Sequence, residues 1–172
     1  MKIPVFFNPL MVSQVVLSSP SPRKPLEVIN EWNQKYNNHI EIKDFLPFEQ
    51  EEFYIAHEKS HVDKIFKLKK SNGFDTKHKE IAQSLYWTSA SFYYAAVQAL
   101  EKGIAVSPTS GFHHAGFDYA WGFCTFNGLL ITAMKLIKER NLKVGILDFD
   151  YHQGDGSENI IHHFNLYDKI IH

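Results

Sequence analysis

The sequence predicts an α/β fold in which a parallel sheet lies between helices. Short apolar segments alternate with amphipathic helical segments along the chain, which is the pattern of a parallel sheet with helical crossovers. Residues 144–149 form a nearly continuous apolar run, as expected for a strand covered on both faces. Loops rich in Gly, His and Asp follow two of the strands, at the edge where open α/β sheets bind ligands.

The elements expected in the first part of the chain are two strands separated by a helix. Residues 3–7 are apolar and aromatic, which favours a buried strand. Residues 18–22 contain two prolines and three serines and therefore form a loop. After Pro25, a residue suited to the first helical turn, apolar side chains recur at helical spacing. Residues 41–45 are a second candidate strand, which Pro47 ends.

The middle of the chain is predicted to be mostly helical. Residues 51–70 are polar and helical, with a break near Ser60. Residues 71–73, Ser-Asn-Gly, are expected to form a turn that ends this helical segment. A long helix is expected over about residues 77–102, because its apolar positions are spaced by helical turns. Gly103 follows it, as a C-terminal capping glycine does.

The alternation continues to the last residue. The expected elements are a strand at 104–106, a loop at 107–123, a helix at 127–140, a strand at 144–149, a helix at 157–164 and a strand beginning at 169.

Composition excludes several classes of protein. The length of 172 residues indicates one domain, and 44% hydrophobic with 22% charged residues is ordinary for a globular protein. With 18 basic and 19 acidic side chains, the net charge of −1 argues against a general nucleic-acid binder. The single cysteine, Cys124, excludes an internal disulfide and a cysteine-based zinc finger. No apolar run approaches the ~20 residues of a membrane span, and no clean signal peptide is present, so a cytoplasmic location is expected.

Two segments carry most of the chemistry, and one of them follows the strand at 144–149. Residues two apart in an extended chain face the same side, so Asp148, Asp150 and His152 can project together. Two carboxylates and an imidazole suit a divalent metal that accepts nitrogen and oxygen ligands, with zinc the first choice. The structural alternative is a solvated, Asp-rich turn that caps the next helix.

The other segment is a Gly-rich loop that contains two adjacent histidines, His113 and His114. Imidazoles are suited to general acid–base catalysis, and each needs a carboxylate to set its tautomer. Asp148 and Asp155 are available for this purpose. The alternative is a histidine pair that only hydrogen-bonds the loop backbone.

Together, the two segments resemble the histone deacetylase family, which includes bacterial acetylpolyamine amidohydrolases. The matching stretches read SGFHHAGFDYAWGFCTFNG and VGILDFDYHQGDGSENI. Upstream, SNGFDTKHKEIAQSLYWTSASFYYAA is similar to the loop and long helix before the family's tandem histidines, and His57 matches a histidine of an early helix. The resemblance implies a three-layer arginase/deacetylase-like fold and zinc-dependent hydrolysis of acetyl-lysine peptides, acetylpolyamines or related acylated amines.

The resemblance also implies which residues bind metals and substrate. Asp150 and His152 would be two of the zinc ligands. Asp148 would help to bind a structural K⁺ or Na⁺ ion, together with the backbone carbonyls of those two ligands. The substrate-binding residues implied by the resemblance, in the acyl tunnel and at its rim, are Gly122, Phe123 and Asp75.

Proton transfer would fall to the tandem histidines and their carboxylate partners. The resemblance pairs His113 with Asp148 and His114 with Asp155. It makes His114 the general base and acid, and gives His113 a mainly electrostatic role.

Two features differ from the family pattern. The second motif reads His152-Gln153-Gly154, where the family often has a second histidine. The family's third zinc ligand, an aspartate, and its oxyanion tyrosine belong to later segments that these 172 residues do not contain. Residues 1–172 are therefore expected to be the N-terminal part of a histone-deacetylase-like domain, truncated after about half, with the C-terminal part absent.

Such a chain is expected to be inactive alone, because two protein ligands are fewer than a catalytic zinc site normally has. It is also expected to be poorly soluble or oligomeric, unless a complementing chain covers it. A non-catalytic binding module, or one half of a split deacetylase, is the alternative function. A third hypothesis, an arginase-like hydrolase with two metal ions, is less well supported, because such a site needs more Asp and His ligands than this chain shows.

Overall fold

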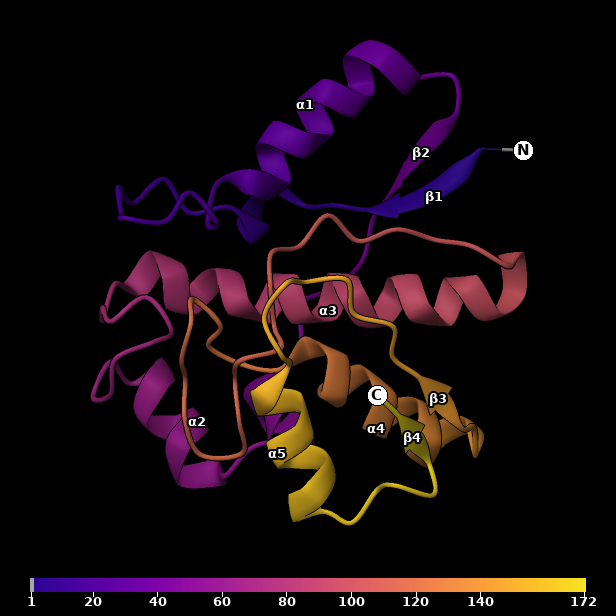
Figure 1. Ribbon diagram of the computed structural model, residues 1–172. Coiled ribbons are helices and arrows are strands. Elements are labelled where there is room, and N and C mark those ends of the chain that lie inside the picture. The colour runs from indigo at the N-terminus through magenta and orange to yellow at the C-terminus, as the bar shows by residue number, and fades with distance from the viewer. Residues whose placement is uncertain (1) are drawn as a thin grey trace. The chain divides into compact units, whose positions relative to one another are not determined.

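A computed structural model of the protein describes residues 2–172 (Figure 1). The described chain divides into two compact units, each built from two separate segments. The first contains the chain up to Phe48 together with His78–Ser110, and the second contains Glu49–Lys77 and Gly111–His172. No helix within the described range is long and apolar enough to cross a membrane.

The first unit contains a small parallel sheet. Strand β1 (Ile3–Phe6) pairs in parallel with β2 (Ile40–Lys43), with Ile3 opposite Ile40. Helix α1 (Lys24–Tyr36) lies between them in the sequence and supplies the crossover that parallel strands require. A short 3₁₀ helix, η1 (Pro9–Met11), follows β1.

Helix α3 (Lys79–Lys102) packs against β1 and η1 within the first unit. The hydroxyl of Ser91 donates to the carbonyl of Phe6 at 2.5 Å, and the Phe6 ring stacks on Tyr94 with centroids 6.3 Å apart. The helix ends at Gly103, whose φ of 82° lies in the left-handed region that glycine adopts without strain. The predicted long helix and its glycine cap are confirmed.

The second unit is mainly helical. Its elements are η2 (Gln50–Ile55), α2 (Lys59–Phe66), α4 (Gly128–Arg140), β3 (Val144–Gly145), α5 (Asp155–His163) and β4 (Ile170–Ile171). Strands β3 and β4 pair in parallel, and α4 packs against η2, β3 and α5. Figure 1 shows α5 beside α4 in this unit.

Aromatic rings form the core of the second unit. The ring of Phe126 lies 4.8 Å from that of Phe53 and 5.3 Å from that of Phe66, measured between centroids. The imidazoles of His57 and His61 are buried against the same Phe126 ring. This core therefore combines large apolar rings with two buried titratable groups.

Three sequence-based predictions need correction. The strand expected at 144–149 ends at Gly145, and the strand expected at 104–106 is reduced to one bridge between Val5 and Val106. The helical segment predicted over 51–70, with a break near Ser60, is by contrast confirmed as η2 and α2, which residues 56–58 separate. Instead of one sheet, the described residues form two separate two-stranded parallel sheets.

The segment that follows β3 bonds its own backbone. The Asp148 side chain accepts the backbone N–H of Asp150, and the Asp150 side chain accepts that of His152, both at 2.9 Å. Aspartate side chains that bond the backbone two residues ahead turn the chain and compete with a strand ladder. The two aspartates of the motif therefore favour turns over residues 148–152.

Candidate functional site

The tandem histidines lie in the loop that precedes α4. His113 is only 6% exposed, whereas His114 is half-buried, and the two ring centroids are 4.2 Å apart. The backbone N–H of Ser157 in α5 donates to the carbonyl of His113 at 2.9 Å. The loop is thereby attached to the first turn of α5.

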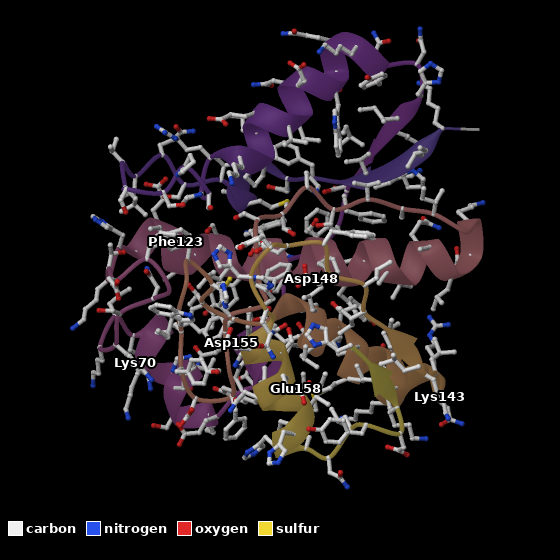
Figure 2. All side chains as sticks on the ribbon, in the orientation of Figure 1. Lys70, Phe123, Lys143, Asp148, Asp155 and Glu158 are labelled. Carbon is white, nitrogen blue, oxygen red and sulfur yellow. The ribbon has the colours of Figure 1, made fainter. Side chains whose placement is uncertain are left out.

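Each histidine contacts one carboxylate through its Nδ1 atom. Nδ1 of His113 lies 2.8 Å from Oδ2 of Asp148, and Nδ1 of His114 lies 2.5 Å from Oδ1 of Asp155. An ionised carboxylate can only accept, so each ring carries its proton on Nδ1 and presents Nε2 as an acceptor. Figure 2 labels the two carboxylates, one from the segment after β3 and one from the first turn of α5.

Electrostatics favour the charged form of Asp148. Partial burial raises its pKa, but the backbone N–H of Asp150 and the ring of His113 outweigh this effect, so the pKa lies below its ordinary value. An ionised Asp148 at neutral pH is the form that can accept the Nδ1 proton of His113.

The two predicted zinc ligands lie together at the exposed end of this segment. Oδ1 of Asp150 is 3.1 Å from Nδ1 of His152 and 3.9 Å from Nε2 of His113. The backbone N–H and side chain of His152 lower the pKa of Asp150, which keeps the carboxylate ionised. Both predicted ligands are therefore side by side and open to solvent.

The donor set fits part of a zinc site. Two atoms 3.1 Å apart can both lie ~2.0–2.2 Å from one ion, the usual zinc distance to nitrogen and oxygen. Across the described residues, however, no group of three or more His, Cys, Asp or Glu side chains is arranged to hold a metal. The K⁺ or Na⁺ ion expected at Asp148 stays a prediction.

Gly122 and Phe123 form a strained turn against His114. Both have positive φ values, 56° and 65°, and Phe123 is a bulky residue in this region. The backbone N–H of Phe123 donates to the carbonyl of Gly73 at 2.9 Å, and its ring lies 5.8 Å from that of Phe74. A Cβ at Gly122 would lie 2.5 Å from Cδ2 of His114, so only glycine fits there.

Asp75 and Trp121 complete the surroundings of the site. Asp75 is exposed in the loop 71–77, has a φ of 56°, and donates its N–H to the carbonyl of Asn72 at 3.0 Å. The Trp121 ring is 61% exposed and lies 6.4 Å from that of His114, between centroids. Trp121 was not predicted as a site residue, and only its place beside Gly122 in the motif could have indicated it.

The sequence did not predict the buried polar residues that bond the loop containing His113 and His114. Asn127 and Ser157 are fully buried and bonded to one another, and His57 bonds the backbone of Asn127. Asn127 could have been identified only as the residue before a helix, which is a common place for Asn.

The sequence of the chain is similar to a known protein family and to several curated proteins. The family model described as histone deacetylase domain matches residues 20–167. The acetoin utilization protein AcuC of Staphylococcus aureus strain COL is 50% identical over 48 residues, which is 28% of this chain and 12% of that protein. Acetylpolyamine amidohydrolase 2 of Pseudomonas aeruginosa is 42% identical over 50 residues, 29% of this chain and 14% of that protein.

A solved structure, the HD domain of HDA15, has the same fold. Its TM-score is 0.80 at 18% identity, and the match covers 99% of this chain and 52% of that chain. The chain thus spans about half of that structure, and the matched stretches span a fifth or less of the curated relatives. The predicted arginase/deacetylase-like fold is supported by this match.

Proposed function

Because the chain belongs to the histone deacetylase domain family, we propose that it takes part in zinc-dependent hydrolysis of an acylated amine. The observation that carries the proposal is the pair of contacts His113–Asp148 and His114–Asp155, beside Asp150. Family membership favours this function over a role in binding alone.

The proton transfers would be made by His114. Its Nδ1–H is held by Asp155, so Nε2 can take one proton from the water molecule whose oxygen attacks the acyl carbon. When the carbon–nitrogen bond breaks, the same proton passes from Nε2 to the leaving amine. Asp155 stabilises the intermediate imidazolium, and His113 with Asp148 supplies a second polarised imidazole beside it.

Asp150 and His152 would hold the metal, with one oxygen and one nitrogen donor on adjacent turns. A zinc ion bound there would polarise the acyl carbonyl and lower the pKa of the attacking water. We propose that the third protein donor comes from outside the described residues, since catalytic zinc normally has three.

An exposed apolar row supports this part of the proposal. Leu147, Phe149 and Tyr151 are 80, 88 and 97% exposed, in alternation with the aspartates and His152 of the motif. Large apolar side chains in such a row normally mark a contact surface. The remainder of a deacetylase domain, in the same polypeptide or a second one, would cover this row and supply the missing donor.

The acyl chain of the substrate would pass Gly122 and the ring of Phe123, with Asp75 at the outer edge. The relatives whose names include acetylpolyamine amidohydrolase support acylated amines as the substrate class. Acetylated lysine peptides and acetylpolyamines both present the same acetamide on a flexible chain.

Metal binding tests the proposal without relying on turnover. The untagged chain is titrated with Zn²⁺ by calorimetry, alongside the variants His152→Ala and Asp150→Ala. The matched control is His162→Ala, which removes an exposed histidine of α5. We expect binding in the wild type and the control and at least tenfold weaker binding in both ligand variants. Equal binding in all four proteins, or none in the wild type at millimolar Zn²⁺, would reject the proposed metal site.

A further inference from the structure

Resting on the proposed function, we propose that Asn127, His57 and Ser157 are positioning residues for His114. They form one buried polar network that holds the backbone on both sides of His114. None of them is among the residues that would touch zinc or substrate. Their effect on the reaction would pass entirely through the loop to which they are bonded.

His57 holds one end of the network. Its ring is 1% exposed, its Nδ1 lies 2.8 Å from the carbonyl oxygen of Gly116, and its Nε2 accepts the N–H of Asn127 at 2.9 Å. Because a backbone N–H can only donate, Nε2 must be unprotonated and Nδ1–H must donate to Gly116. The two partners therefore allow a single neutral tautomer of His57.

Asn127 is the centre of the network. Its side chain is fully buried, and Nδ2 donates to the carbonyl of Ala115 at 3.1 Å and to the hydroxyl of Ser157 at 3.0 Å. Its Oδ1 accepts the N–H of Leu130 at 3.1 Å, which caps α4. One amide therefore joins the His114 loop to the first turns of both α4 and α5.

The first turn of α5 completes the support. Ser157 donates its N–H to the carbonyl of His113 at 2.9 Å. Gly156 lies directly on the loop, since a Cβ there would be 2.4 Å from the carbonyl carbon of His114. Asp155, on the same turn, reaches Nδ1 of His114.

The carbonyls of residues 113, 115 and 116 are thus each bonded to one member of the network. These bonds leave the backbone around His114 little freedom to shift relative to Asp155. A proton-transfer group must be held within hydrogen-bond reach of its partner, so the network would set the His114–Asp155 contact.

The test uses Asn127→Asp, which keeps the oxygen that caps α4 but removes the Nδ2 donor. Asn8→Asp is the matched control, because Asn8 caps η1 through Oδ1 with the same acceptor chemistry at a half-buried position. The purified chains are labelled with ¹⁵N-histidine, and the Nδ1–H signal of His114 and its exchange with water are followed by NMR. Circular dichroism reports whether each variant is folded.

In folded Asn127→Asp we expect the His114 Nδ1 proton to exchange about tenfold faster than in wild type, the factor that one net hydrogen bond supplies. Asn8→Asp should leave it unchanged. Unchanged exchange in folded Asn127→Asp, or an equal change in Asn8→Asp, would overturn the proposal.

Should Asn127→Asp fail to fold, Ser157→Ala decides the same question. It removes only the hydroxyl bonded to Asn127 and keeps the N–H bond to His113. A measurable rise in exchange supports the positioning role, and wild-type exchange rejects it. Because no outcome depends on zinc or turnover, failure of this proposal is distinguishable from failure of the proposed function.

Discussion

Nδ1 of His114 lies 2.5 Å from Oδ1 of Asp155, although 41 positions separate the two residues. The contact exists because Asp155 opens α5 and the next residue, Gly156, packs against the backbone of His114. A carboxylate at a helix N-terminus is also favoured by the helix dipole. One helical turn therefore provides the partner of the histidine and the contact that holds its backbone.

Replacing Gly122 by Ala should disturb His114 directly. The new Cβ would lie 2.5 Å from Cδ2 of the imidazole, and the positive φ of 56° adds about 1–2 kcal/mol of backbone strain. We expect a lower free energy of unfolding and a shifted His114 ring signal by NMR. Gly145→Ala is the control, since no atom lies within 4 Å of its Cβ position. Equal behaviour of the two variants would contradict the close contact.

Gly156→Ala tests whether the close contact of α5 with the His114 loop outweighs the higher helix propensity of alanine. Alanine favours a helix over glycine by about 1 kcal/mol, so a freely exposed helical position would gain stability. Here the Cβ would lie 2.6 Å from the carbonyl oxygen of Ala115, and neither backbone can yield without moving the loop. We expect a net loss of about 1–3 kcal/mol, measured by urea unfolding. A stabilised variant would show that α5 does not pack on this loop.

The two buried histidines should respond in opposite ways to replacement by Leu. His57→Leu leaves the N–H of Asn127 and the carbonyl of Gly116 without partners and should cost about 2–4 kcal/mol. Neither ring nitrogen of His61 makes a hydrogen bond of good geometry among the described residues, and the Thr125 backbone is only a weak partner. His61→Leu should therefore be neutral or stabilising when both variants are compared by thermal unfolding. Similar losses in both would contradict this difference in bonding.

Stability should fall as the pH drops below about 6.5. Burial lowers the pKa of His57 to about 4 and that of His61 to about 3, from 6.5. The unfolded chain then binds protons that the folded chain excludes, so unfolding becomes easier toward pH 4, by up to about 1.4 kcal/mol per pH unit for each histidine. Urea unfolding at pH 7.5, 6.5 and 5.5 measures this slope. His61→Leu should make it shallower, and an unchanged slope would argue against a neutral buried His61.

Cys124 should be unreactive while the protein is folded. Burial raises the pKa of its thiol from 9.0 to about 11, which lowers the thiolate fraction near pH 8 about a hundredfold. A disulfide reagent should therefore label Cys124 at least this much more slowly in buffer than in denaturant. Rapid labelling of the folded chain would show that the loop around Cys124 opens readily.

The motifs predicted which residue types meet at the candidate site, because its side chains lie in two short, distinctive segments. The tandem histidines and the D-x-D-x-H pattern can be identified without knowing the fold, and they led to the family that residues 20–167 match. The long helix ending at Gly103 was equally predictable, because its periodicity and its cap are local. The roles given to all of the site residues, in catalysis, metal binding and substrate binding, stay predictions.

Other features depended on three-dimensional contacts. The apolar run after Val144 predicted a longer strand, but β3 pairs with β4 only over Val144–Gly145, and the Asp148 and Asp150 side chains bond the backbone further on. His57 matched a histidine of the family, but nothing in the sequence indicated that it bonds Asn127 or that Asn127 bonds Ser157.

The sequence by itself therefore determined the family and the residue types of the candidate site, because those properties depend on residue identity and local spacing. Only the tertiary structure decided which buried donor meets which carbonyl, and where a glycine is required against His114. The physical reason is that a hydrogen bond or a close contact depends on atoms within about 3 Å of each other. Segments distant along the chain reach such separations only after the helices and loops have packed.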